Sequence, residues 1–129
     1  MIPREKKRDL SEDEAWQIAL EDHPEWHKAL LEDELPDEVI GENGQPMNVT
    51  LHLTLHAMIE RQLAADDPEG VVAVARELKQ LGLSRHDIRH AIGSVLIQHI
   101  WSIWRNRQTF DPARYLAELS DIVETCREA

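Results

Sequence analysis

The sequence predicts an all-α fold, a compact antiparallel bundle of five to six helices, and three observations support this prediction. Apolar residues recur at spacings of three and four along most of the chain, which is the period of a helix with one buried face. Residues that favour helix N-termini precede these segments, and glycine or proline follows several of them. No segment shows the convincing alternation of apolar and polar residues that indicates a strand.

Two short helices are expected first. Ser11 and Glu14 have the spacing of a capping box, in which each side chain bonds the backbone of the other residue. Pro24 interrupts this helix or restarts it, because proline is favoured at the first helical position. The second segment continues to about Asp33, and the proline and glycine residues between positions 35 and 47 predict one long loop.

Four further helices are expected after this loop. Each is preceded by a side chain that can accept a hydrogen bond from the free N–H groups of the first turn. The predicted caps and approximate ends are Asn48 to Ala65, Asp67 to Gly82, Ser84 to Asn106, and Asp111 to the C-terminus. The third of these helices is apolar around most of its circumference, as expected at the centre of a bundle. The tryptophans lie at apolar helical positions and are expected in the core; they are Trp16, Trp26, Trp101 and Trp104.

Length and cysteine content predict one cytoplasmic domain. A chain of 129 residues is near the usual size of a single domain, so we expect one domain over residues 1–129, with residues 1–10 as a flexible N-terminal tail. The single cysteine, Cys126, excludes an intramolecular disulfide and a cysteine-based zinc cluster, and it is expected to be a packing residue. We find neither a secretory signal nor an apolar run long enough to span a membrane.

The net charge of −11 is unevenly distributed. Between Ser11 and Met47 there are 12 acidic residues and one base, Lys28, a balance that repels a phosphate backbone. Nucleic acid is therefore not an expected partner. The acidic stretch is interpreted as a solvated surface, or alternatively as the entrance to a cation-binding site. An apolar stripe on the last helix and the four tryptophans are also compatible with a homodimer.

Histidine spacing is the main indication of function. Six of the seven histidines form pairs separated by four residues, whereas roughly 0.3 such pairs would be expected by chance over this length. Residues four apart on a helix share a face, so two imidazoles can converge on one ion. The three pairs are His23/His27, His52/His56 and His86/His90.

Helical periodicity places two of these pairs on apolar faces. His52 and His56 share a face with Ile59 and other apolar residues, and His86 and His90 share one with Gly93 and further apolar residues. Burial of an imidazole costs free energy unless it finds a hydrogen bond or a metal. Several inward-facing histidines therefore indicate a shared partner.

Glu60 follows His56 by another four residues and could bridge two ions or act as a base. Imidazole and carboxylate ligands without thiolate suit a transition-metal ion, with iron or zinc the leading candidates. Four or five histidines and one carboxylate would suffice for a dinuclear centre of the kind that hemerythrin-like bundles hold. We find no phosphate-binding glycine loop or hydrolase motif, so the sequence predicts neither a reaction nor a small-molecule substrate.

An alternative interpretation needs no metal. Any single histidine pair is more often structural, and Pro24 lies inside the first pair, where it can disrupt the alignment of the two rings. His99 lies on another face of its helix and is expected to be a core or interface residue. The protein would then be a non-enzymatic interaction module with structural or pH-responsive histidines, and the acidic region and long loop would form its partner surface.

The chain resembles a family of short, uncharacterised bacterial proteins that form a domain of unknown function. The resemblance spans about residues 10 to 120 and is carried by three segments: His23-Pro24-Glu25-Trp26-His27, Asn48 to His52 followed by His56 and Gln62, and His86 and His90 with Trp101 downstream. Members often have tyrosine at the position of Trp26 and proline at that of Val49, and neither departure removes a histidine. The carboxylate of Glu60 is not part of the resemblance. The resemblance implies that the histidines act together as one set, and it implies no particular reaction.

Overall fold

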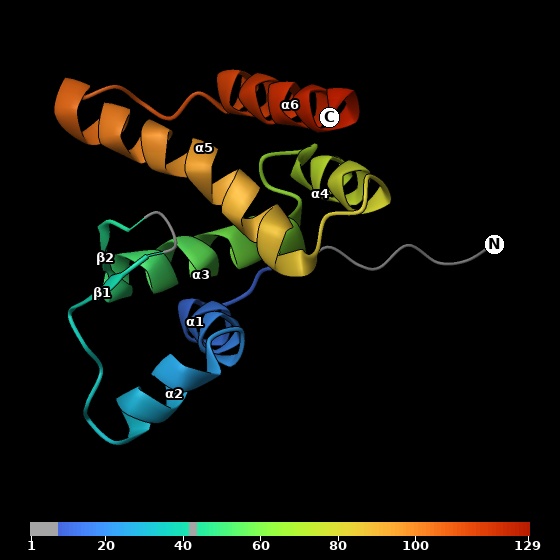
Figure 1. The fold of residues 1–129 in the computed structure, drawn as a ribbon. Coiled ribbons are helices and arrows are strands. Elements are labelled where there is room, and N and C mark those ends of the chain that lie inside the picture. The colour runs from blue at the N-terminus through green and yellow to red at the C-terminus, as the bar shows by residue number, and fades with distance from the viewer. Residues whose placement is uncertain (1–7, 42–43) are drawn as a thin grey trace. The chain divides into compact units, whose positions relative to one another are not determined.

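The structure is a computed structural model that describes residues 8–41 and 44–129. These residues form six helices and one small two-stranded sheet, so the all-α prediction is confirmed (Figure 1). The elements in chain order are α1 (Glu12–Glu21), α2 (Pro24–Leu31), β1 (Glu38–Ile40), β2 (Pro46–Asn48), α3 (Val49–Ala65), α4 (Val71–Gln80), α5 (Arg85–Asn106) and α6 (Pro112–Glu128).

The chain divides into two compact units. The N-terminal unit, Leu10–Arg61, contains α1, α2, the hairpin and most of α3. The C-terminal unit, Gln62–Ala129 together with residues 1–9, contains the end of α3 and helices α4 to α6. The single domain over residues 1–129 stays a prediction. Residues 1–7 of the expected tail lie outside the described residues, whereas the Arg8 N–H donates to the Ala64 carbonyl at 3.0 Å.

The N-terminal unit begins with the helix pair that the sequence predicts. Ser11 and Glu14 form the complete capping box at the start of α1. Pro24 restarts the helix, because α1 ends at Glu21 and α2 begins at Pro24 itself. The two helices pack against each other, and Ala15 and Ala19 of α1 are fully buried.

The predicted long loop contains a hairpin that the sequence did not predict. Strands β1 and β2 are antiparallel, with Glu38 opposite Asn48. Each strand has three residues, too few to show alternation, and one contains a proline, which usually argues against a strand. The hairpin leads directly into α3, where the Asn48 side chain accepts a hydrogen bond from the Leu51 N–H at 2.8 Å, as predicted for an N-cap.

The C-terminal unit is a packed group of three helices, with α4, α5 and α6 in pairwise contact. Tyr115 of α6 is fully buried, and its hydroxyl donates to the Gln62 side chain at the end of α3 over 2.8 Å. Burial raises the pKa of Tyr115 to about 12. The buried apolar residues of the three helices are Val71, Val74, Leu78, Ile88, Ile92, Val95, Leu96, Leu119 and Val123.

The start of α4 corrects one prediction. Asp67 was expected to cap this helix, but the carboxylate that accepts the backbone N–H groups of Gly70 and Val72, both at 3.1 Å, belongs to Asp66. The helix therefore begins at Val71, three residues later than Pro68 suggested. The predicted caps Ser84 and Asp111 are confirmed, and each accepts the N–H of the residue three positions ahead.

Two tryptophans of α5 are not in the core. Trp101 is 39% exposed and Trp104 is 76% exposed, so the prediction that they are core residues is wrong, whereas Trp26 is buried. The reason is that α5 packs within its own unit through Ile88, Ile92 and their neighbours on one face. In the part of the chain that the structure describes, no helix combines the length and apolar character needed to span a membrane.

Candidate metal centre

His23 lies at the junction of α1 and α2. Its backbone forms the N-terminal cap of α2, and Pro24 follows at the first helical position. Proline cannot continue α1, since it lacks an N–H donor and its ring clashes with the preceding turn. The side chain at this break is buried, with 8% exposure, and its Nδ1 donates to the Ala19 carbonyl at 2.7 Å.

This hydrogen bond determines which nitrogen of His23 can bind a ligand. A carbonyl oxygen only accepts hydrogen bonds, so Nδ1 must carry the proton. In the neutral ring, Nε2 then holds a lone pair. Metal-binding histidines are usually oriented in this way, by donation from the other ring nitrogen to a carbonyl or carboxylate. The Nε2 atom of His23 is therefore electronically suited to bind a cation.

His52 and His56 lie one turn apart on α3. Their ring centroids are 4.5 Å apart, which confirms that the spacing of four brings the two imidazoles together. His56 is buried and His52 is partly exposed. Ile59, on the same face of the helix, is fully buried. The face that carries this pair is thus largely removed from solvent, as predicted.

The structure brings His23 together with the α3 pair (the three-histidine cluster). Its ring centroid lies 5.1 Å from that of His52 and 4.7 Å from that of His56, with both pairs of rings nearly perpendicular. One potential ligand atom from each histidine lies within 4.8 Å of the other two. A tetrahedral ion bound at about 2.1 Å separates its ligand nitrogens by about 3.4 Å. The nitrogens would therefore close by at most about 1.4 Å around an ion.

Trp26 supports this cluster from α2. Its ring stacks on His23, with centroids 4.8 Å apart and an angle of 5° between the planes, and it contacts His52 edge-on at 5.4 Å. Because Trp26 is buried, these contacts restrict the rotation of both imidazoles. His23 is the N-cap of α2 and Trp26 lies three residues further on, in the first turn, where the two rings can meet.

The model of one protein family matches residues 4–121 of the chain, and its description is "Domain of unknown function (DUF1841)". The chain belongs to this family. The matched region contains the whole three-histidine cluster. No curated protein and no solved structure matches the chain.

Two further predicted ligands of this DUF1841 protein lie in the N-terminal unit but outside the cluster. The side chain of His27 is partly exposed on α2, and its backbone N–H donates to the His23 carbonyl. The two histidines of the first pair therefore differ in position. Because α2 begins at Pro24, His23 precedes the helix and His27 lies within it. Glu60 is buried, with 7% exposure, one turn beyond His56 on α3. Both residues stay candidate ligands on the evidence of the sequence.

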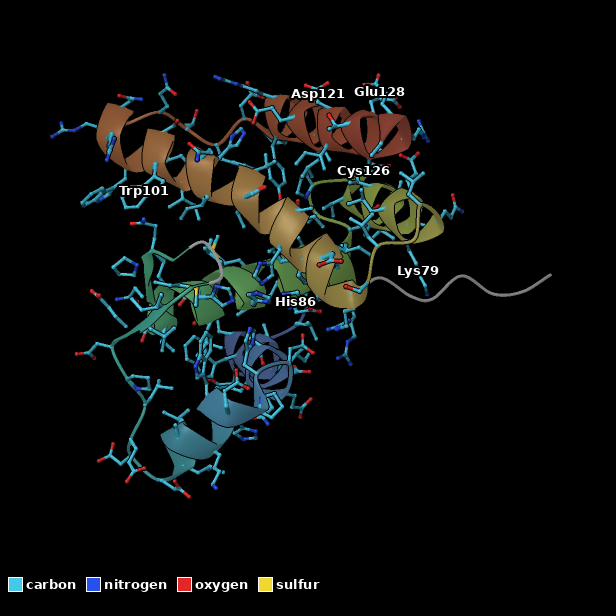
Figure 2. The ribbon with its side chains drawn as sticks, in the orientation of Figure 1. Lys79, His86, Trp101, Asp121, Cys126 and Glu128 are labelled. Atoms are coloured by element: carbon cyan, nitrogen blue, oxygen red, sulfur yellow. The ribbon has the colours of Figure 1, made fainter. Side chains whose placement is uncertain are left out.

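His86 and His90 lie in the C-terminal unit, near the start of α5. His86 is labelled in Figure 2. Their ring centroids are 4.1 Å apart, so this pair also converges as its spacing predicts. Both side chains are exposed, which corrects the expectation that their face is buried inside the bundle. Two exposed imidazoles can bind an ion only with the help of water or further ligands.

His99 forms a separate polar network between α5 and α6. Its Nε2 donates to Oε2 of Glu118 at 2.8 Å, and Arg114 donates to Oε1 of the same carboxylate at 3.0 Å. The hydrogen bond from His99 is the main cause of a lowered pKa of Glu118, with a further contribution from Arg114. His99 is buried, as the sequence predicted for a core residue.

The sequence could not predict that the cluster combines His23 with the α3 pair and excludes His27. Spacing along one helix identifies His52 and His56, but the approach of His23 depends on the packing of two separate helices. Trp26 was expected only as a core residue, and its stacking on His23 was missed. The segment from His23 to His27, with an aromatic residue at its fourth position, was the available indication.

Proposed function

We propose that the N-terminal unit binds one transition-metal ion through His23, His52 and His56, and that zinc or iron is the ion it holds. The observation that carries the proposal is that all three ligand atoms lie within 4.8 Å of one another on two buried and one partly exposed histidine. The orientation of His23 by the Ala19 carbonyl supports it, since such contacts are typical of metal-binding histidines.

Three imidazoles leave a coordination position open. Structural zinc sites are closed by four protein ligands, whereas catalytic sites combine three protein ligands with water or substrate. The partly exposed side chain of His52 gives the cluster an edge accessible to solvent. A metal held there would supply Lewis-acid chemistry or activate water, which makes the protein a candidate metalloenzyme of unknown reaction.

A second ion, as in the predicted dinuclear centre, would need further ligands. Glu60 is the candidate within the same unit, because it is buried one turn beyond His56 and a carboxylate can bridge two ions. His86 and His90 offer two imidazoles, and two ligands hold an ion less tightly than three. We therefore propose the three-histidine cluster as the primary site.

Metal analysis of tag-free protein tests the proposal. Wild type purified from cells, or loaded with zinc and desalted, should retain about one tightly bound equivalent. His52→Gln and His56→Gln should each lose it while keeping the helical circular dichroism of wild type. His27→Gln is the matched control, because it removes a neighbouring histidine outside the cluster, and it should retain the ion.

The His86→Ala/His90→Ala variant should also retain this equivalent, because the pair is outside the primary site. Wild type that takes up neither zinc nor iron would contradict the proposal. The histidines would then be structural or pH-responsive groups of an interaction module, the alternative that the sequence leaves open. Loss of the ion in His27→Gln, with retention in His52→Gln, would show that the proposed ligand set is wrong.

A further inference from the structure

The net charge of the protein belongs entirely to one unit. The N-terminal unit, Leu10–Arg61, contains 13 acidic residues against two bases, Lys28 and Arg61, which gives −11. The C-terminal unit, counted with residues 1–9, contains 12 acidic and 12 basic residues and therefore has no net charge. The unit that holds the three-histidine cluster thus carries the whole −11 of the chain.

Two of these acidic residues are adjacent along the chain to residues of the cluster and its support. Asp22 directly precedes His23, and Glu25 lies in the first turn of α2, one residue before Trp26. Both carboxylates are exposed. Further exposed acids line the chain from α1 to β1, whereas Lys28 is the one base of that stretch.

Such a charge distribution selects ligands by their sign. A surface that carries mainly one charge produces a potential of several kT, which concentrates ions of the opposite sign and depletes ions of its own sign. Exposed charges are screened beyond a Debye length of about 8 Å at physiological salt, so the effect is strongest for groups close to the centre and at low ionic strength. Neutral imidazoles add no charge, so the bound ion itself contributes two positive charges against the −11 of the surrounding unit.

We propose that the open position of the three-histidine centre takes neutral or cationic ligands and disfavours anions, so that its substrate class is an uncharged or amine-bearing molecule rather than a phosphate or carboxylate. This inference rests on the proposed metal site. The same field favours uptake of the divalent cation itself. Proteins that recognise phosphate or carboxylate commonly use arginine or lysine, and the acidic stretch offers the opposite charge.

Ligand binding to the cobalt-loaded protein tests this inference, because the visible absorption of Co²⁺ reports its coordination. Azide is the anionic probe and imidazole, at about pH 8, is the neutral probe. Raising the ionic strength from about 0.01 M to about 0.3 M with sodium perchlorate should tighten azide binding about threefold to tenfold, because the acidic field is screened. Imidazole binding should change less than twofold under the same conditions.

A charge-removing variant gives an independent test. Glu25→Gln/Glu32→Gln/Glu34→Gln removes three exposed acids of the N-terminal unit and should tighten azide binding about threefold at low salt, with imidazole unaffected. The matched control, Glu25→Asp/Glu32→Asp/Glu34→Asp, keeps the charge and should match wild type. Azide binding that responds neither to salt nor to the charge-removing variant would overturn this inference alone. Failure of the protein to take up cobalt, zinc or iron would overturn the metal site and this inference with it.

Discussion

At the scale of single residues, His23 and Trp26 determine whether three imidazoles can meet. His23 is held on one side by its hydrogen bond to the Ala19 carbonyl and on the other by the stacked indole of Trp26. Both contacts restrict the ring before any ion binds. A ligand that is already oriented loses less conformational entropy on binding, so these contacts should increase metal affinity.

Replacement of Trp26 tests this orientation. Trp26→Ala removes a buried aromatic side chain and should lower the free energy of unfolding by about 3–5 kcal/mol. It should also weaken zinc affinity about 10-fold or more, since loss of a supporting contact around a metal site typically costs this much. Urea denaturation of the metal-free protein and zinc titration measure the two effects.

Trp26→Phe is the control for this prediction, because phenylalanine keeps a flat ring that can stack on His23. It should retain most of the zinc affinity. If Trp26→Ala, studied under conditions where it is folded, binds zinc as tightly as Trp26→Phe, stacking does not contribute to the site.

Glu118 provides a prediction about pH. Its pKa is lowered in the folded protein from the ordinary value of 4.5, mainly by the hydrogen bond from His99 and additionally by Arg114. A lowered folded-state pKa contributes stability that is fully present above the unfolded-state pKa and is lost as pH falls through the folded-state value. Glu118→Gln should therefore be less stable than wild type near neutral pH, and the difference should shrink below about pH 4.5.

Thermal unfolding of wild type and Glu118→Gln across this pH range measures the difference. Glu124→Gln serves as the comparison, because it also removes one acid from α6, at an exposed position. A stability difference for Glu118→Gln that stays constant from neutral to acidic pH would show that the carboxylate charge is not the cause.

At the scale of helices and strands, local hydrogen bonds explain which predictions succeeded. Ser11, Asn48, Ser84 and Asp111 cap their helices as expected, because each cap joins residues only three apart. At α4 the N-cap is Gly70, and the carboxylate that accepts the N–H groups there was misassigned because Asp66 and Asp67 are adjacent and both can accept a hydrogen bond. The hairpin was missed because its three-residue strands have no periodicity of their own and depend on pairing across a turn.

In the candidate site, too, local features could be predicted from the sequence and contacts between distant residues could not. His52 and His56 could be predicted as a pair because both are on α3. The approach of His23 to them depends on how the junction between α1 and α2 packs against α3, and spacing along the chain does not contain this information. For His86 and His90, apolar neighbours on the same face of α5 predicted burial. Both side chains are nevertheless exposed, because the face is not covered at the start of the helix where they lie.

The N-cap of α3 can be tested as an element. Asn48→Ala removes the hydrogen bond to the Leu51 N–H and should lower the free energy of unfolding by about 1 kcal/mol. The expected effect on zinc affinity is small, because His52 lies a full turn beyond the cap and His56 two turns beyond it. Urea denaturation and zinc titration measure both quantities.

Asn48→Asp is the matched control, since aspartate is as good an N-cap as asparagine and should retain the stability of wild type. Equal destabilisation by Asn48→Ala and Asn48→Asp would indicate that the amide acts through the hairpin rather than as a cap of α3.

At the scale of the whole molecule, the candidate ligands and the net negative charge lie in the same unit. The three-histidine cluster and the entire net charge of −11 are both in Leu10–Arg61. The C-terminal unit instead has balanced charge, a buried apolar core and the His99–Glu118 network. Composition alone identified the acidic stretch, but its association with three converging histidines required the fold.

X-ray absorption spectroscopy of the zinc-loaded protein tests the central claim most directly, because it reports the number and type of ligands around the ion. The proposed site predicts three imidazole nitrogens at about 2.0–2.1 Å from the ion and a water oxygen as the fourth ligand. His52→Gln should lose this signature, whereas His27→Gln should preserve it. A coordination shell with fewer than three imidazoles, or one that is unchanged in His52→Gln, would contradict the three-histidine metal centre.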